Sequence, residues 1–232
     1  MTARPFIVAI DGPAGAGKST ASKELARRLG LTLVDTGAIY RCVALAAARE
    51  GIALDDDARL DALLPRLRIS FQGDGALNRV FLGDEDVSAA IRTPDISMGA
   101  SKVSSRPVVR AGLLDLQRRL AREAKVGAVL EGRDIGTVVF PDADVKFFLV
   151  AAPEVRARRR LAELEAKGTP ATFDEVLADQ VRRDRDDSSR AVAPLRPADD
   201  AIRIDSSTEG LEEVVRRLET EVRACLAHRI RP

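Results

Sequence analysis

The stretch FIVAIDGPAGAGKST, residues 6–20, decides the fold. Residues 6–10 are a continuous apolar run with β-branched side chains, which predicts a buried strand. Residues 12–19 then match the pattern G-x-x-x-x-G-K-[S/T], and apolar side chains follow at helical spacing. A strand, a glycine-rich loop and a helix in this order predict a phosphate-binding loop. The loop comprises Gly12, Pro13, Ala14, Gly15, Ala16, Gly17, Lys18, Ser19 and Thr20.

The residue types of this loop suit a nucleoside triphosphate bound together with Mg²⁺. Glycines allow backbone N–H groups to turn towards phosphate oxygens, and a helix N-terminus adds partial positive charge. We expect Lys18 to reach the β- and γ-phosphates and the Ser19 hydroxyl to be a Mg²⁺ ligand. The alternative is an ordinary glycine-rich turn in which Lys18 is solvated.

Four further apolar segments predict strands of the same sheet, at residues 31–34, 128–131, 145–150 and 201–205. Amphipathic helical segments alternate with them, so the sequence predicts an α/β fold with a five-stranded parallel sheet and helices on both faces. Residues 67–87 break the alternation. Their strand pattern around Gly73, Asp74 and Gly75 predicts an antiparallel hairpin inserted beside the parallel sheet.

A charged cluster, RRDRDDSSR at residues 182–190, follows a predicted helix. Thr172 and Glu175 are spaced as a capping box at the start of that helix. We expect the charged cluster to lie at the end of the helix, outside any strand. Taken alone, such a run is typical of a solvated, salt-bridged surface.

Composition restricts the class of protein. The chain has 232 residues, 45% of them apolar, and a net charge of +1. This argues against disorder and against a general nucleic-acid binder, which needs a basic excess. Two cysteines, Cys42 and Cys225, make no disulfide framework, and the single histidine, His228, argues against a nucleophile activated by histidine. With no signal peptide, no segment long enough to span a bilayer and no sustained heptad pattern, we expect a cytoplasmic monomer that does not bind membranes.

The phosphate-binding loop by itself serves GTPases, motor ATPases and small-molecule kinases alike. The sequence has no N-K-x-D motif to bind guanine, and the strand at residues 145–150 lacks the terminal acid typical of motor ATPases. A kinase for a small acceptor is favoured. A nucleotide-binding switch without phosphoryl transfer is the alternative from another class.

Three polar segments follow predicted strands or begin helices. DTGAIYR, residues 35–41, follows the second strand, SKVSSRPVVR, residues 101–110, lies around the start of a long helix, and EGRD, residues 131–134, ends the third strand. Ligands bind at the C-terminal edge of open parallel sheets, so residues at this edge are candidates for a ligand site. For Thr36 the alternative is a helix cap.

The phosphate loop, DTGAIYR, EGRDIGTVVFPDA, RRDRDDSSRAVAPL and the hairpin insertion, in this order and spacing, resemble the bacterial cytidylate kinase family of nucleoside monophosphate kinases. The resemblance covers nearly the whole chain. It implies transfer of the ATP γ-phosphoryl group to CMP or dCMP with Mg²⁺. It also implies one P-loop kinase unit over residues 1–232, with a monophosphate-binding domain at about 36–110 and a lid at about 153–192.

The resemblance also implies roles for single residues. Thr36, Arg41, Ser101, Arg110, Arg133, Asp134, Arg183 and Asp187 would bind the acceptor, and Lys18, Arg133, Arg183 and Arg190 would act on the transferring group. It assigns no role to Arg156, Arg159, Arg160, Arg185 or Asp186. Glu131 stands where some members have aspartate, and Thr36 where some have serine.

The proposed chemistry agrees with the residue types. The attacking phosphate oxygen is already anionic near neutral pH, so no general base is needed. Arginines suit two polyanions that must approach each other, and a carboxylate such as Asp134 accepts a hydrogen bond from the cytosine amino group. We expect Asp187 and its neighbours to neutralise the lid arginines until phosphate replaces them. Kinases for UMP, AMP, dTMP or shikimate on the same fold stay open as alternatives.

Overall fold

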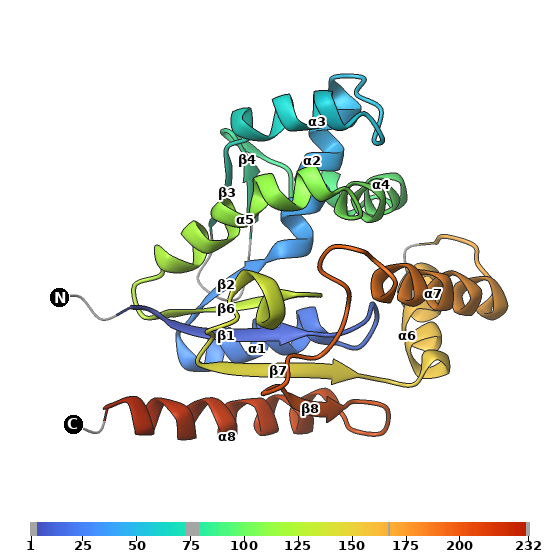
Figure 1. Cartoon of the computed structure of the whole chain (residues 1–232). Coiled ribbons are helices and arrows are strands. Elements are labelled where there is room, and N and C mark those ends of the chain that lie inside the picture. Colours follow the sequence, from blue (N-terminus) through green and yellow to red (C-terminus); the bar gives the residue numbers. More distant parts are fainter. Residues whose placement is uncertain (1–3, 73–78, 167, 231–232) are drawn as a thin grey trace. The chain divides into compact units, whose positions relative to one another are not determined.

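The computed structural model describes residues 4–72, 79–166 and 168–230 (Figure 1). Its contacts divide the chain into two compact units. Unit 1 comprises Met1–Phe6 and Ala26–Leu130, and unit 2 comprises Ile7–Leu25 and Glu131–Pro232. The narrower division expected from the sequence, with a monophosphate-binding domain at 36–110 and a lid at 153–192, stays a prediction.

The main sheet of the described residues has five strands in the order β2-β6-β1-β7-β8. Their bounds are β1 Phe6–Asp11, β2 Thr32–Asp35, β6 Gly127–Gly132, β7 Val145–Val150 and β8 Ile202–Asp205. The pairs β1–β7 and β7–β8 are parallel, with Val8 opposite Val145 and Phe147 opposite Ile202. The α/β fold and the five predicted strands are confirmed. Every residue of β1 and five of the six in β7 are buried, as expected of strands covered on both faces.

In unit 2, helices cover the strands and extend beyond them. The long helix α8, Leu211–Ile230, packs against β7 (Figure 1). Its side chains Val214, Val215, Leu218 and Val222 are buried. The helices α6, Pro153–Ala166, and α7, Phe173–Ser188, pack against each other. A short π-helix, η3, spans Ile135–Val139 directly after β6. The phosphate loop continues into α1, Lys18–Leu29.

Helix α7 begins at the predicted capping box, but it extends further along the chain than predicted. Thr172 accepts a hydrogen bond from the Glu175 N–H, and the Glu175 side chain accepts one from the Thr172 N–H. However, residues 182–188 of the charged cluster are helical and do not follow the helix. Ion pairs one turn apart, such as Arg183 with Asp179, stabilise helix where apolar side chains are missing.

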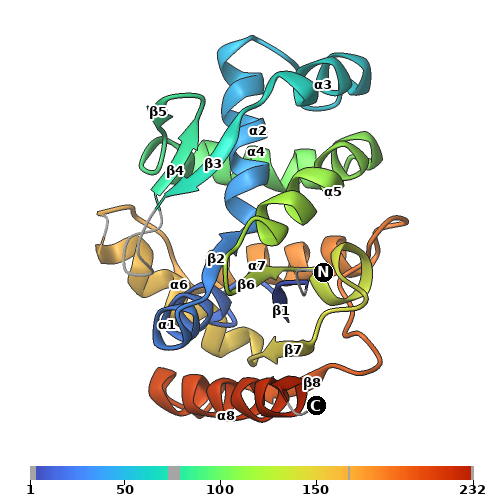
Figure 2. The same ribbon diagram turned by 90° about the vertical axis from the view of Figure 1, so that its left-hand side faces the viewer.

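Unit 1 contains four α-helices among its described residues: α2 Thr36–Arg49, α3 Asp57–Leu63, α4 Pro94–Ser104 and α5 Pro107–Arg122. Helix α2 packs against α4, and α3 against α5 (Figure 2). A second, antiparallel sheet has the order β3-β4-β5, with bounds Ile69–Gln72, Arg79–Leu82 and Glu85–Asp86. The predicted antiparallel insertion is therefore confirmed, and it gains β5 as a third short strand. The predicted turn at Gly73, Asp74 and Gly75 lies outside the described residues.

Among the described residues, no helix is long and apolar enough to cross a membrane.

Candidate active site

The phosphate loop joins β1 to α1 and is shaped by three glycines. Gly12, Gly15 and Gly17 have φ of +146°, +77° and +85°, a region that side-chain-bearing residues rarely adopt. A Cβ atom on Gly12 would lie 2.0 Å from the Leu149 carbonyl oxygen, so β7 also requires glycine at this position. The sequence therefore folds into the loop that its pattern predicts.

Lys18 is buried at the first position of α1, where its Nζ donates a hydrogen bond of 2.7 Å to the Pro13 carbonyl oxygen. Burial and, after it, repulsion from Arg133 lower the pKa of Lys18 to about 7, against the attraction of Glu131, Asp11 and Asp187. A buried cation repelled by a second cation is a site at which an anion stabilises the charged form. Lys18 thus has the environment expected of a phosphate-binding lysine.

Ser19 is hydrogen-bonded to Glu131, a residue to which no role was assigned from the sequence. The Ser19 hydroxyl donates a hydrogen bond of 2.8 Å to the carboxylate of Glu131, which is buried near the end of β6. An acid at the end of an apolar strand was visible in AVLE, residues 128–131, and was the available signal. A hydroxyl and a carboxylate side by side are oxygen donors of the kind that Mg²⁺ prefers. The side chains present therefore fit this ion.

Asp11 connects β1 to the segment that carries Asp134. Its two carboxylate oxygens accept hydrogen bonds from the N–H groups of Ile135, at 2.9 Å, and Gly136, at 2.8 Å. Burial is the main cause that raises the pKa of Asp11 to about 6, and the nearby charge of Asp134 adds to it. Asp134 itself is buried, and its carbonyl oxygen accepts hydrogen bonds from the N–H groups of Val138 and Val139. The backbone around Asp134 is therefore held from both sides.

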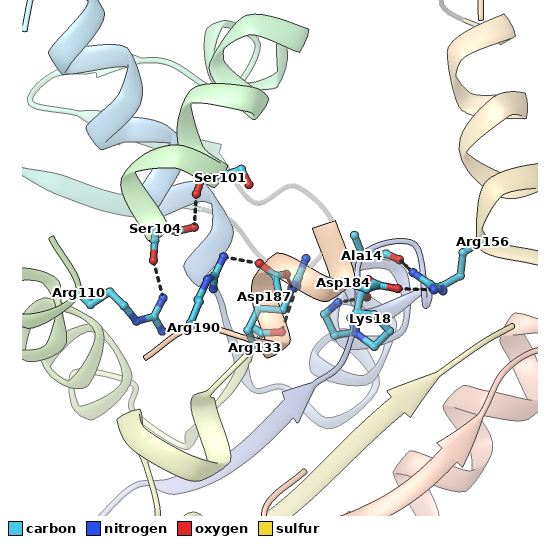
Figure 3. Close-up of polar contacts among 12 residues, drawn as sticks. Ala14, Lys18, Ser101, Ser104, Arg110, Arg133, Arg156, Asp184, Asp187 and Arg190 are labelled. Atoms are coloured by element: carbon cyan, nitrogen blue, oxygen red, sulfur yellow. Dashed lines mark hydrogen bonds and ion pairs between the residues drawn. The ribbon is translucent and has the colours of Figure 1, made fainter. Parts of the chain in front are cut away.

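Arg133 and Arg190 converge on the same carboxylate. Arg133 Nε donates to Asp187 Oδ2 at 2.9 Å, and Arg190 pairs with Asp187 Oδ1 (Figure 3). Asp187 is buried on the last turn of α7. We call these three residues the arginine cluster. Arg183 does not join it, because its guanidinium pairs with Asp179 at 2.9 Å on the same helix.

Unit 1 carries the remaining predicted residues. Asp35, and not Thr36, is the N-cap of α2, because its Oδ1 accepts from the Ala38 N–H at 2.9 Å. Its Oδ2 accepts from Arg41 at 2.9 Å. Thr36, buried, is the first residue of α2, so the capping alternative for Thr36 is wrong. Aspartate directly before a helix is a common cap, so Asp35 itself was the available signal for the start of α2.

Arg110 is buried near the start of α5. It donates to the Ser104 carbonyl oxygen at 3.0 Å (Figure 3). Its guanidinium lies 5.7 Å from the centre of the Tyr40 ring. Ser101 is exposed on α4, and its carbonyl oxygen accepts from the Ser104 hydroxyl at 2.9 Å. The helices α4 and α5 both belong to unit 1. Ser104 contacts both Ser101 and Arg110.

Of the residues to which no role was assigned, Arg156 and Arg159 contact loops of unit 2. Arg156 donates to the Ala14 carbonyl oxygen at 3.0 Å, and Arg159 to the Ser206 carbonyl oxygen at 2.6 Å. Arg160 pairs with Glu163 on its own helix, and Arg185 and Asp186 are exposed. The sequence carried no signal that separates Arg156 from its neighbours in RARRR, residues 156–160.

Comparisons with known proteins point to one family. The family model for cytidylate kinase matches residues 8–224. A cytidylate kinase of Geobacter sulfurreducens is 58% identical over 220 residues, which cover 95% of this chain and 94% of that protein. One of Vibrio cholerae is 47% identical over 215 residues, covering 93% and 95%.

Comparison of structures adds a likeness of fold alone. A crystal structure of an uncharacterized protein from Eubacterium ventriosum has a TM-score of 0.53 and 12% sequence identity, and the match covers 94% of this chain and 99% of that one.

Proposed function

The chain belongs to the cytidylate kinase family, and from this premise we propose that it transfers the γ-phosphoryl group of ATP to CMP and dCMP, which yields CDP or dCDP and ADP. The observation that carries the proposal is the concentration of cations at the phosphate loop of unit 2. Lys18 is buried there, and Arg133 is near enough to lower its pKa. Such a site stabilises bound polyphosphate and the negative charge that develops on the transferring group.

In the proposed reaction, a phosphate oxygen of the acceptor attacks the γ-phosphorus of ATP. The bond between the γ-phosphorus and the β,γ-bridging oxygen breaks, and ADP leaves. The attacking oxygen is anionic near neutral pH, so no side chain has to remove a proton. The loop Gly12–Thr20, which includes Lys18, holds the ATP phosphates. Ser19 and Glu131 would hold Mg²⁺, which would supply positive charge against the charge of the phosphates.

The arginine cluster and Arg183 act on the transferring group. While Asp187 neutralises Arg133 and Arg190, the two guanidinium groups stay close without repelling each other out of the site. Phosphate oxygens then replace the carboxylate as partners, and Asp187 becomes available for the sugar. Arg183, whose pair with Asp179 is partly exposed, joins them when phosphate is bound.

Acceptor recognition depends on unit 1 and on Asp134. Thr36 and Arg41, at the start of α2, and Arg133 bind the CMP phosphate. Ser101, Arg110 and Asp134 bind the cytosine base: Asp134 accepts from the amino group, and Arg110 donates to ring N3 or the 2-oxygen. Uracil sets a carbonyl oxygen against the Asp134 carboxylate, which leaves buried polar groups unpaired and is strongly disfavoured.

We further propose that the protein works as a cytoplasmic monomer on these small substrates, with neither nucleic acid nor membrane as a partner. The near-neutral net charge of +1 and the absence of a bilayer-spanning helix among the described residues support this.

The test is ADP release from ATP and Mg²⁺ with CMP, dCMP, UMP, AMP or shikimate offered separately. We expect rapid turnover with CMP and dCMP only. For Asp134→Ala we expect kcat/KM for CMP to fall at least about a hundredfold, because the base loses its partner. The exposed Asp142→Ala is the matched control and keeps the wild-type rate. Rapid turnover with another acceptor would refute the substrate assignment. Slow hydrolysis unaffected by any acceptor would favour a nucleotide-binding switch.

A further inference from the structure

Arg156 is a buried arginine that joins three elements of unit 2. It projects from the first turns of α6 and is 2% exposed. Its Nε donates to the Ala151 carbonyl oxygen at 3.0 Å and its Nη1 to the Ala14 carbonyl oxygen at 3.0 Å. Its Nη2 pairs with Asp184 Oδ2 at 2.5 Å (Figure 3). The end of β7, the phosphate loop and α7 therefore share one guanidinium.

The contact with Ala14 orients a peptide group of the phosphate loop. In a trans peptide the C=O and the following N–H point in opposite directions. With the Ala14 oxygen held towards Arg156, the N–H of Gly15 points away from Arg156. That N–H belongs to the set that is expected to face phosphate oxygens.

The same two helices also close around Gly15. A Cβ atom on Gly15 would lie 3.1 Å from the Arg156 Cβ and 3.2 Å from Gln180 Nε2. Gln180, buried on α7, donates through Nε2 to the Arg156 carbonyl oxygen at 3.2 Å. The phosphate loop therefore packs at Gly15 against Arg156 of α6 and Gln180 of α7.

Through Asp184, the contact of Arg156 with the phosphate loop extends to the residues near the end of α7. Asp184 lies on α7 next to Arg183 and one turn before Asp187, which holds Arg133 and Arg190. The ion pair between Arg156 and Asp184 therefore connects the helix that carries the proposed lid residues to the backbone of the phosphate loop. Burying a charged guanidinium costs free energy, and an apolar side chain of similar size would fill the same space without that cost. The burial of Arg156 is therefore not explained by packing alone.

We propose that Arg156 is a positioning residue that couples α7 to the phosphate loop, so that the loop has its full affinity for ATP only while Asp184 holds the Arg156 guanidinium. The proposal rests on the proposed function, because it deepens how ATP is bound. Arg156 itself touches loop backbone and Asp184, and acts on ATP through them.

The test is the equilibrium Kd for ATP of the full-length chain, measured by calorimetry for Arg156→Met, Asp184→Asn and the double variant. We expect Arg156→Met to raise Kd about tenfold or more. We expect Asp184→Asn to raise Kd as well. This variant removes a negative charge near the phosphates, and the loss of Coulomb repulsion alone would instead tighten binding. The double variant binds no more weakly than Arg156→Met, because both changes break one connection. ATP binding that is unchanged or tighter in Asp184→Asn would overturn the proposal.

Two further variants separate coupling from charge and from general damage. Arg156→Lys keeps the charge but has no fork to reach three partners, so we expect it to bind ATP as weakly as Arg156→Met. Full affinity in this variant would show that charge alone acts. Arg158→Met is the matched control, since the exposed Arg158 also joins α6 to α7, through the Phe173 ring 5.8 Å away, without touching the loop. We expect its ATP affinity to equal that of the wild type.

The experiment also distinguishes this proposal from the proposed function. If the wild type binds ATP and transfers nothing to CMP, the proposed acceptor is wrong, while the pattern of ATP affinities still tests Arg156. If transfer to CMP is rapid and all variants bind ATP equally, the proposed function stands and the coupling fails. If Arg156→Met destabilises the fold, Asp184→Asn and Arg156→Lys decide the question.

Discussion

Asp11 is a buried carboxyl group whose protonation affects stability. Burial raises the pKa of Asp11 to about 6, against the hydrogen bonds from Ile135 and Gly136 that favour its charged form. An unfolded chain holds this group near its model value of 3.8. Between these two values the folded state binds more protons than the unfolded state. The contribution of Asp11 to stability therefore falls as pH rises through this window.

Replacing Asp11 by asparagine tests this directly. We expect the free energy of unfolding of the wild type, relative to Asp11→Asn, to fall by about 2 kcal/mol between pH 4 and pH 7. Urea unfolding of both proteins across this range measures it. The exposed Asp142→Asn, compared in the same way, gives a difference that does not change with pH in this direction. A difference for Asp11 that rises with pH would contradict the burial argument.

At the scale of single residues, the sequence was informative where a motif dictates both type and spacing. Lys18 and Ser19 follow from the glycine pattern, and the structure places both in the phosphate loop. The pairing of Glu131 with Ser19 and that of Arg156 with Ala14 could not be predicted, because the partners lie 112 and 142 residues apart. Contacts over such separations depend on the folded sheet, and no local pattern encodes them.

Helix α7 connects several parts of the proposed site, so its own stability matters. It has few buried apolar side chains, and its last turns are entirely polar. The capping box of Thr172 and Glu175 satisfies backbone N–H groups at its start, and ion pairs support it further along. A helix with this composition depends more than most on its cap.

Thr172→Ala is therefore expected to lower the free energy of unfolding by about 1 kcal/mol. Urea or thermal unfolding followed by circular dichroism measures the change. Thr169→Ala, three residues earlier and outside the cap, is the matched control and should cost less. Equal stability of Thr172→Ala and the wild type would show that the cap does not support α7.

Elements with a clear apolar period were predictable, and those without one were missed. The continuous apolar runs of β1 and β7 identified them to within a residue. Helix α4 was not predicted, since its sequence PDISMGASKVS has few apolar side chains and an internal glycine. The π-helix at Ile135–Val139 reads as apolar strand, and its conformation depends on the carboxylate of Asp11, which is distant in sequence.

On the scale of the whole molecule, the residues proposed to bind ATP belong to unit 2, and those proposed to bind the acceptor are found in both units. The α/β class, the parallel sheet and the antiparallel insertion were all predictable. The glycine-rich loop, the apolar strand segments and the turn residues are each short local patterns, so each can be recognised in the sequence. The convergence of Arg133 and Arg190 on Asp187 was not predictable in its details, because it joins the end of β6 to the end of α7.

The central claim is that the protein transfers a phosphoryl group from ATP to CMP with the help of these arginines. The most direct measurement is the rate of CDP formation from saturating ATP, Mg²⁺ and CMP by the wild type, Arg190→Met and Arg182→Met. Arg182 is exposed on α7, eight residues before Arg190, and pairs with Asp179, so its variant is the matched control. We expect rapid CDP formation by the wild type and the control, and a rate lower by about a thousandfold in Arg190→Met. Equal rates in all three, or no CDP from the wild type, would contradict the claim.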